Sequence, residues 1–229
     1  MSATGRNLEG HERLVDDFYA TPAWVTRAIL PHLKDAACVL DPCCGDGAIL
    51  DAVAGYTQYG RIGTLGLELD NDRALKTSMR HKVGTCDSLG PECWPMADTL
   101  ITNPPYSLAL AFIERWLIEE TCPTAAFLLR LNFLGSQKRA AFHKKNPADV
   151  FVLPRRPGFV LALSCKPKAG GCGWGGMYPL DPVTEEAPDA PKVCPKCSHA
   201  LQSSSSDATE YAWFVWGPGR GNRWFMLDV

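Results

Sequence analysis

The sequence lacks long apolar runs and lacks a strong excess of charge of either sign. No apolar run approaches the roughly 18 residues that would suggest a membrane-spanning helix, and the first residues, MSATGRNLEGHERL, lack the apolar core of a secretory signal peptide. The net charge is -2 and 46% of the 229 residues are hydrophobic, as in an ordinary soluble protein. We therefore expect a cytoplasmic protein without a membrane partner, built as one α/β domain with an elaboration.

Disulfides are not expected either, although the chain has ten cysteines. In a reducing compartment, clustered cysteines bind metal more often than they form disulfides. Four cysteines gather between residues 165 and 197. The other six are scattered, and we expect them to be small buried hydrophobes: Cys38, Cys43, Cys44, Cys86, Cys93 and Cys122.

Apolar strands alternate with helical patterns over residues 21–154. Thr21 and Pro22 are typical of a helix N-cap and a first helical position, and residues 71–81 predict a helix capped by Asn71. Near-continuous apolar strands separated by helices predict a mostly parallel sheet covered on both faces. The expected strands are 36–41, 61–70, 83–88, 97–105, 124–131 and 149–154, and the later helices are 48–56, 108–120 and 135–145.

The composition changes after Pro154. Residues 161–208 are rich in Gly, Pro, Ser and Cys and poor in periodic apolar runs, which indicates an insertion rather than a sheet layer. Strand patterns return in residues 209–229. We expect a catalytic domain over 1–160, a cysteine-rich insertion over 161–208 and terminal strands over 209–229 that complete the catalytic sheet.

Polar residues stand where the predicted parallel strands end. Asp41, Glu68, Asp87 and Asn103 all take this position, and ligands bind at the carboxyl ends of such strands. The first strand is followed by DPCCGDG, whose glycines permit a sharp turn and a close approach of the backbone to a ligand. The loop lacks both the GxGxxG spacing and the lysine of a phosphate loop, so a phosphate-rich cofactor is disfavoured and the acids favour a cationic ligand.

The segment TNPPY, residues 102–106, predicts a rigid clamp for an amino group. Pro104 and Pro105 each fix a φ angle and remove a backbone donor, so the segment cannot continue a sheet ladder. The side-chain oxygen of Asn103 and the carbonyl of Pro104 can both accept from one NH₂ group, and Tyr106 offers a flat face for stacking. The alternative is a turn that only terminates a strand.

Together these motifs resemble a known enzyme family. DPCCGDG, the acid of GLELD, TCD and TNPPY are similar to those of the S-adenosylmethionine-dependent amino-methyltransferases. FYATPAWV, ahead of the glycine loop, resembles the cofactor-binding segment in one permutation class of N6-adenine DNA methyltransferases. The resemblance covers roughly residues 15–155 and implies a Rossmann-like methyltransferase fold with a mostly parallel, seven-stranded sheet, in a bacterial cell or a phage-infected host.

The resemblance also implies a role for each matching residue. Asn103 and Pro104 would hold the N6 amine of an adenine flipped out of double-stranded DNA, beside Pro105, and Tyr106 would stack on the base. Glu68 would bind the ribose of S-adenosylmethionine and Asp87 its adenine amine. The remaining cofactor contacts implied are Tyr19, Thr21, Asp41, Cys43, Gly45, Gly47, Leu69 and Asn103.

Other substrates use a similar clamp. N6-adenine methylation of RNA and N5-glutamine methylation of a protein remain alternatives, as does a catalytically inactive zinc-bearing protein that binds nucleic acid. Cytosine-N4 enzymes usually carry serine in place of Asn103, so the sequence favours adenine. The recognition sequence and the oligomeric state are not encoded in any motif.

The four late cysteines predict a structural zinc site. Cys194 and Cys197 have the CxxC spacing that lets two thiolates hold one zinc ion, and Cys165 and Cys172 would complete the set. His199 is the alternative ligand if Cys165 is not used. Zinc would fold an insertion that has few apolar residues. The resemblance implies that this zinc-ribbon-like insertion contacts DNA.

Basic residues gather within and after the last predicted helix. The candidates for contact with nucleic acid are Lys138, Arg139, Arg155 and Arg156. Further candidates are Lys144, Lys145, Lys166, Lys168, Arg220 and Arg223. A solvated helix face followed by a basic loop is the alternative interpretation.

Overall fold

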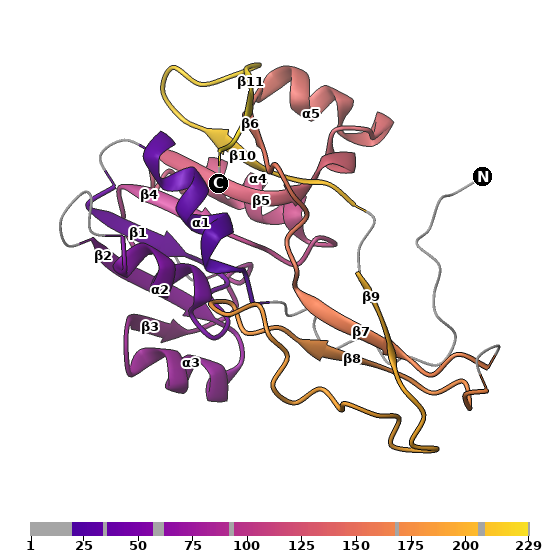
Figure 1. Cartoon of the computed structure of the whole chain (residues 1–229). Helices are drawn as coiled ribbons and strands as arrows, with labels where there is room; N and C mark the ends of the chain where they lie inside the picture. The colour runs from indigo at the N-terminus through magenta and orange to yellow at the C-terminus, as the bar shows by residue number, and fades with distance from the viewer. Residues whose placement is uncertain are drawn as a thin grey trace.

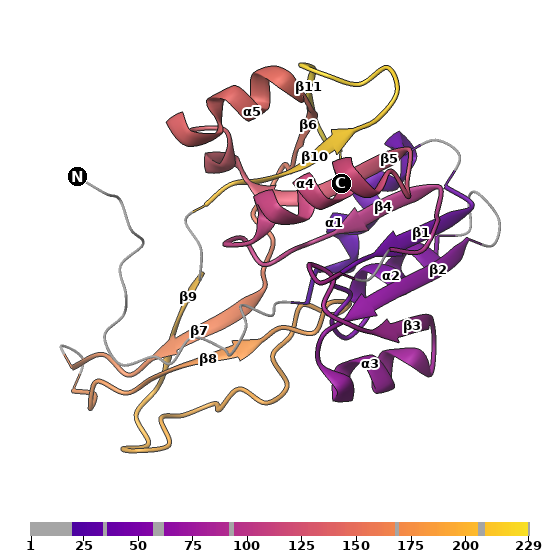
Figure 2. The ribbon, with the colours of Figure 1, turned by 180° about the vertical axis from the view of Figure 1, so that it is seen from behind.

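The chain folds around one large sheet with helices on both faces (Figures 1 and 2). The computed structural model describes residues 20–33, 36–56, 62–91, 94–167, 170–205 and 209–228. The strands of the large sheet are β1 (Cys38–Asp41), β2 (Gly63–Glu68), β3 (Lys82–Thr85), β4 (Thr99–Thr102), β5 (Thr124–Arg130), β6 (Asp149–Val152), β10 (Tyr211–Trp216) and β11 (Trp224–Met226). Their order is β11-β6-β10-β5-β4-β1-β2-β3. Only β10 runs antiparallel to its neighbours, β5 and β6.

The helices bury apolar side chains against both faces of this sheet. They are α1 (Ala23–Ile29), α2 (Ala48–Ala54), α3 (Asn71–Ser78), α4 (Ala109–Glu119) and α5 (Ala140–Lys145), with short 3-10 helices η2 (Leu30–His32), η4 (Leu131–Phe133) and η5 (Gln137–Arg139). α1 and α2 contribute to one apolar cluster, and α4 contributes to the cluster on the opposite face (Figures 1 and 2). The expected mostly parallel sheet between helical layers is therefore confirmed. Within the described part of the chain, the helices are all too short or too polar to cross a bilayer.

The sheet has eight strands, whereas the resemblance implied seven. The edge strand beyond β6 is β11, which lies within residues 209–229, where terminal strands were predicted. β11 has only three residues, and its side chains are exposed. Phe225 nevertheless stacks on Phe151 of β6 with ring centroids 4.5 Å apart. The buried carboxylate of Asp149 accepts from the Arg223 guanidinium and from the amide of Gly221, which fixes the connection to β11.

Three helix starts differ from the expected ones. Asp70, not Asn71, caps α3, because its carboxylate accepts from the amide of Arg73 at 2.8 Å. α1 begins at Ala23 without a side-chain cap, so the hydroxyl of Thr21 is left for another partner. The helix expected over 135–145 starts as the 3-10 turn η5 and becomes α-helical only at Ala140.

The insertion forms a small sheet of its own. β7 (Val160–Ser164) pairs antiparallel with both β8 (Gly175–Pro179) and β9 (Gln202–Ser205), in the order β8-β7-β9. This sheet lies beyond the ends of the large sheet toward which β1 and β2 point (Figures 1 and 2). The insertion is therefore a separate layer on the side of the molecule where parallel sheets bind ligands.

Candidate functional site

A cavity of about 520 Å³ opens at the carboxyl ends of β1, β2 and β4. Its volume is in the range of small-molecule sites. It brings together most of the predicted site residues, from five separate segments: Thr21, Asp41, Cys43, Glu68, Leu69, Asp87, Asn103, Pro104, Pro105 and Tyr106. Tyr19 lies outside the described residues, and Gly45 and Gly47 do not line the cavity.

Asp41 is the most deeply buried acid of this cavity, with 1% of its surface exposed. Burial raises its pKa to about 7, although it accepts from the Thr102 hydroxyl at 2.7 Å and from the Cys43 amide at 3.1 Å. The Cys43 Sγ lies 2.9 Å from the same hydroxyl, and burial raises the pKa of this thiol well above its usual value. Cys43 is therefore a neutral wall of the site, while Asp41 is a carboxyl that a bound cation would ionise.

Three of the five scattered cysteines that the structure describes are less buried than expected. Cys44 and Cys122 are buried, but Cys38, Cys43 and Cys86 are only half-buried. Cys43 and Cys86 face the cavity, so they provide ligand-facing surface. Cys93 lies outside the described residues.

The glycine loop shapes the site from behind. Gly45 and Gly47 have φ angles of 55° and 87°, the left-handed region that glycine adopts without strain. A Cβ on Gly47 would lie 2.7 Å from the side chain of Thr77, so a larger residue would push α3 away. The Gly45 amide donates to Glu68 Oε2 at 2.8 Å. The loop therefore positions Glu68, and its glycines do not take the direct contact with the cavity that the sequence predicted.

Glu68 has a partner that sequence reasoning missed. Its Oε1 accepts from the Asp70 amide at 2.9 Å and lies 3.3 Å from the Arg73 guanidinium, which also lines the cavity. The sequence could have indicated this contact, because Arg73 follows Glu68 by five residues and lies in the first turn of a predicted helix. Any ligand that Glu68 holds is also within reach of a cation.

Asn103 presents an unused acceptor. Its Nδ2 donates to the Thr21 hydroxyl at 3.0 Å, whereas its Oδ1 is buried and accepts no hydrogen bond from any residue in the described ranges. A buried oxygen without a donor is costly unless a ligand provides one. Pro104 follows directly, and both residues line the cavity. The clamp is therefore shaped for a group that donates hydrogen bonds.

Tyr106 is held by two side chains that the motif did not reveal. The Arg130 guanidinium lies 4.8 Å from the centre of the Tyr106 ring, and the Tyr211 ring lies 5.8 Å from it. Arg130 Nε also donates to the Tyr211 hydroxyl at 3.2 Å. β5 and β10 supply these residues, so the pairing of two strands far apart in sequence fixes the aromatic wall.

The apolar and acidic edge of the cavity lies on the β2 and β3 side. Leu69 is 69% exposed although it lines the cavity, which leaves its side chain available to a planar ligand. Asp87 accepts from the Leu89 amide at 2.9 Å and keeps further acceptor capacity.

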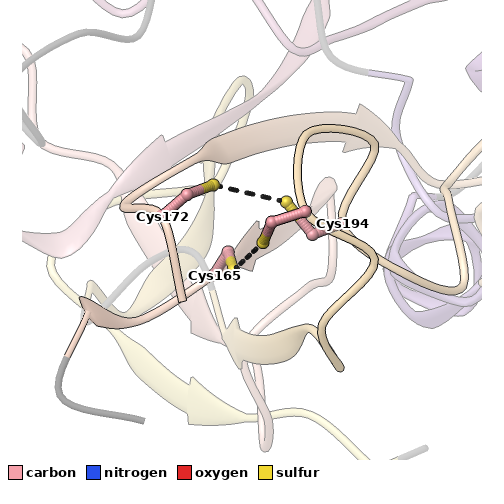
Figure 3. Close-up of side chains that lie close together, drawn as sticks. Cys165, Cys172 and Cys194 are labelled. Carbon is pink, nitrogen blue, oxygen red and sulfur yellow. Dashed lines mark hydrogen bonds between the residues drawn. The ribbon is translucent and has the colours of Figure 1, made fainter. Parts of the chain in front are cut away.

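The four late cysteines converge on one point in the insertion. Figure 3 shows Cys165, Cys172 and Cys194 of this group. The four sulfurs lie within 4.8 Å of one another, with Cys165 Sγ 3.5 Å from Cys197 Sγ and Cys172 Sγ 3.6 Å from Cys194 Sγ. Tetrahedral Zn²⁺ with Zn–S bonds of ~2.3 Å separates its sulfurs by ~3.8 Å. The donor set and the spacing fit a closed structural zinc site.

A backbone amide favours the thiolate form of Cys197. The amide of His199 lowers the pKa of Cys197 to about 6. The imidazole of His199 instead lies near the Cys197 carbonyl, with Nδ1 3.3 Å away, and it is not part of the cluster. The predicted four-cysteine set is therefore the one brought together, and the alternative with His199 is not.

The arginines among the predicted nucleic-acid contacts are bonded to other groups of this chain. Arg155 and Arg156 pair with Glu185 and Glu210, at 3.2 and 2.6 Å. Arg139 donates to the carbonyl oxygens of Phe133 and Asn132. Lys138 is exposed. Arg220 and Arg223 both approach Asp149, and Lys168 lies outside the described residues.

Comparisons with known proteins relate the fold, but not the sequence, to enzymes. The sequence matches none of the protein-family models and none of the curated proteins with which it was compared. Among solved structures, a Listeria monocytogenes protein assigned to the class I S-adenosylmethionine-dependent methyltransferases is 14% identical with a TM-score of 0.56, over 96% of this chain and 68% of that one.

Two further structures are similar. The methyltransferase subunit of a Streptococcus thermophilus type I restriction-modification system is 14% identical with a TM-score of 0.52, over 91% of this chain and 47% of that one. The 23S rRNA methyltransferase ErmE is 13% identical with a TM-score of 0.51, over 89% of this chain and 71% of that one. The chain thus spans about half the length of the restriction-modification subunit. These likenesses establish the Rossmann-like methyltransferase fold.

Proposed function

We propose that this protein transfers a methyl group from S-adenosylmethionine to the N6 amine of adenine in DNA. The observation that carries the proposal is the buried Oδ1 of Asn103, which accepts no hydrogen bond from the described residues and lies in a cavity lined by four acids and one cation. A cavity of this kind suits a cationic cofactor and a second ligand that brings an NH₂ group. The methyltransferase fold of the similar structures supports it.

The residues present fit the cofactor. Asp41 would face the cationic methionine end, Glu68 the ribose hydroxyls, and Leu69 and Asp87 the adenine and its amine. When bound, S-adenosylmethionine supplies an electrophilic methyl group on a sulfonium. Because Arg73 already contacts Glu68, the ribose would share this carboxylate with the guanidinium.

The clamp residues would prepare the amine. Asn103 Oδ1 and the carbonyl of Pro104 would each accept one hydrogen of the NH₂ group, which turns its lone pair toward the cofactor side of the cavity. An aromatic amine is a poor nucleophile because its lone pair is delocalised into the ring. Two acceptors stabilise the positive charge that develops on nitrogen, and Tyr106 would hold the plane of the base.

RNA is the second candidate substrate. The clamp contacts only the base, so nothing in the described cavity distinguishes deoxyribose from ribose. The segment that contains Thr21 favours DNA, because it resembles the one that precedes the glycine loop in the DNA enzymes. Thr21 is buried and bonded to Asn103, which gives this segment a part in the clamp.

We also propose a structural zinc ion on Cys165, Cys172, Cys194 and Cys197, and a role of the insertion in contacting DNA. The zinc would stabilise an insertion whose sheet is small and whose described residues contribute nothing to the two apolar clusters. The position of the insertion beyond the ends of β1 and β2 supports a contact with the substrate (Figure 2).

The decisive experiment is incubation with tritiated S-adenosylmethionine and, in parallel, unmethylated duplex DNA, structured RNA and bacterial protein extract. We expect label in DNA, recovered as N6-methyladenine after digestion to nucleosides. Label in RNA or in protein glutamine would overturn the proposal that DNA is the substrate. It would still support methyl transfer to an NH₂ group held by the clamp. Binding of the cofactor with no labelled product would support the inactive nucleic-acid-binding protein instead.

A further inference from the structure

A loop of the insertion is attached to the first turn of α1. The Ala23 amide, which has no partner within the helix, donates to the carbonyl of Pro182 at 2.7 Å. α1 has no side-chain cap, so the insertion supplies the acceptor that the local sequence does not. The first turn of α1 is thus capped by a residue about 160 positions later in the chain.

Arg155 makes the second attachment between this loop and α1. Its guanidinium lies over the Trp24 ring, 4.2 Å from the ring centre, and its two terminal nitrogens pair with the two oxygens of Glu185 at 3.2 and 3.3 Å. A planar, two-point pair of this kind fixes orientation as well as distance. The guanidinium therefore joins α1 to the loop over 180–186.

The loop itself is rigid. The Asp181 carboxylate accepts from the amides of Val183 and Thr184 at 2.8 and 2.7 Å, and the backbones of Asp181 and Glu186 are also bonded. Glu185 has a φ angle of 56°, a conformation that a residue with a Cβ keeps only when its surroundings hold it. The loop is thus a preformed support.

Thr21 connects this attachment to the amine clamp, because it lies two residues before the start of α1. Thr21 is 3% exposed and accepts from Asn103 Nδ2 at 3.0 Å. With Nδ2 bonded to Thr21, Oδ1 is the amide atom left to accept from the incoming amine. If the amide were reversed, its NH₂ group would face the substrate's NH₂ group, and two donors cannot bond to each other.

We propose that the loop over 180–186 positions the amine clamp, with Arg155 and Glu185 as positioning residues that act through α1, Thr21 and Asn103. The proposal rests on the amino-methyltransferase function proposed above. It assigns the insertion a part in the chemistry in addition to any contact with DNA.

The test compares Glu185→Gln with Glu186→Gln in the full-length protein. The two glutamates are neighbours, but only Glu185 pairs with Arg155, and neither is a cation that could bind phosphate. Glu185→Gln should accelerate deuterium exchange over residues 20–29 and lower kcat roughly tenfold or more, because small displacements of catalytic groups are costly. Affinity for S-adenosylmethionine should change by less than about twofold. Glu186→Gln should match the wild type in all three measurements.

A readout without turnover separates the two proposals. The side-chain NH₂ resonances of Asn103, identified by their loss in Asn103→Asp, should shift or broaden in Glu185→Gln and stay in place in Glu186→Gln. If the wild type methylates nothing while these signals and the exchange rates respond, the proposed function fails and the attachment to the clamp stands. If neither responds to Glu185→Gln, the positioning role is wrong whatever the activity.

Arg155→Lys provides the second variant, because it keeps the positive charge and loses the two-point pairing. A positioning role predicts a lower kcat in this variant, with the affinity for duplex DNA retained. Wild-type kcat in Arg155→Lys, combined with weaker DNA binding in Arg155→Ala, would assign Arg155 to phosphate contact and overturn the proposal.

Discussion

At the residue scale, the amide of Asn103 determines what the site can accept. Replacing Asn103 by Ala removes one acceptor that acts mainly in the transition state, a loss of about 2.7–4 kcal/mol or roughly 10²–10³ in kcat. The affinity for S-adenosylmethionine, measured by calorimetry, should be nearly unchanged. Asn71→Ala is a control, because Asn71 is exposed and Asp70 caps α3 in its place. Turnover of Asn103→Ala close to that of the wild type would remove this residue from the active site.

The protonation of Asp41 should make cofactor binding depend on pH. Burial raises the pKa of Asp41 to about 7 in the protein without ligand, so the carboxyl is largely neutral at pH 6. A cationic ligand favours the ionised form, and its affinity should therefore rise with pH, by up to about tenfold per unit below pH 7, and level off above pH 8. Calorimetric titration from pH 5.5 to 8.5 measures this dependence.

Asp41→Asn is the matching variant. It has nearly the same size and cannot ionise, so its cofactor affinity should be low and nearly independent of pH over this range. Burial also raises the pKa of Asp46, which lines the same cavity, and a pH dependence that survives in Asp41→Asn would assign the effect to Asp46 instead.

At the scale of elements, local patterns predicted most of the large sheet, whereas contacts between distant segments were not predictable. The strands β1, β4 and β5 are buried on both faces and read as apolar runs, so their number and order along the chain were visible. β9 consists of Gln202 and three serines and shows no apolar alternation, so the small sheet of the insertion was missed. The strands of this small sheet form because β7 pairs with both β8 and β9.

Some residues of the candidate site could likewise be predicted from local patterns, whereas others are placed only by contacts between distant segments. Asp41, Glu68, Asp87 and Asn103 could be predicted because strand ends converge on one edge of a parallel sheet. Tyr211 could not, because it reaches Tyr106 only through the pairing of β10 with β5, two strands far apart in sequence. The attachment of Pro182 to α1 likewise depends on how the insertion folds back.

The insertion should depend on metal as one element. Cys194→Ser with Cys197→Ser removes half of the sulfur cluster, and the purified protein should lose its stoichiometric zinc. Residues 165–205 should then become susceptible to limited proteolysis, while the large sheet stays protected. Cys38→Ser is the control, since Cys38 lies at the start of β1 outside the cluster. Wild-type protein that contains no stoichiometric metal by mass spectrometry would refute the zinc site.

At the scale of the whole molecule, charge limits how the protein can hold nucleic acid. The net charge is -2, and three of the four cations predicted to contact DNA already bind carbonyls or carboxylates of this chain. We therefore expect the protein to contact few DNA phosphates. Its affinity for DNA should then depend only weakly on the salt concentration. Base flipping and the clamp would then contribute much of the specificity.

Lys138 and its neighbour Arg139 provide the test of this view. Lys138 is exposed, so Lys138→Ala should weaken binding to all duplex sequences alike and reduce the slope of log affinity against log salt by about 1, without changing the melting temperature. Arg139 holds the carbonyl of Phe133 at 2.7 Å and covers its ring, so Arg139→Ala should instead destabilise the fold by about 1–2 kcal/mol. Filter binding from 50 to 200 mM salt and thermal unfolding separate the two effects. An unchanged salt slope in Lys138→Ala would mean that the phosphates contact another part of the molecule, with the insertion as the next surface to probe.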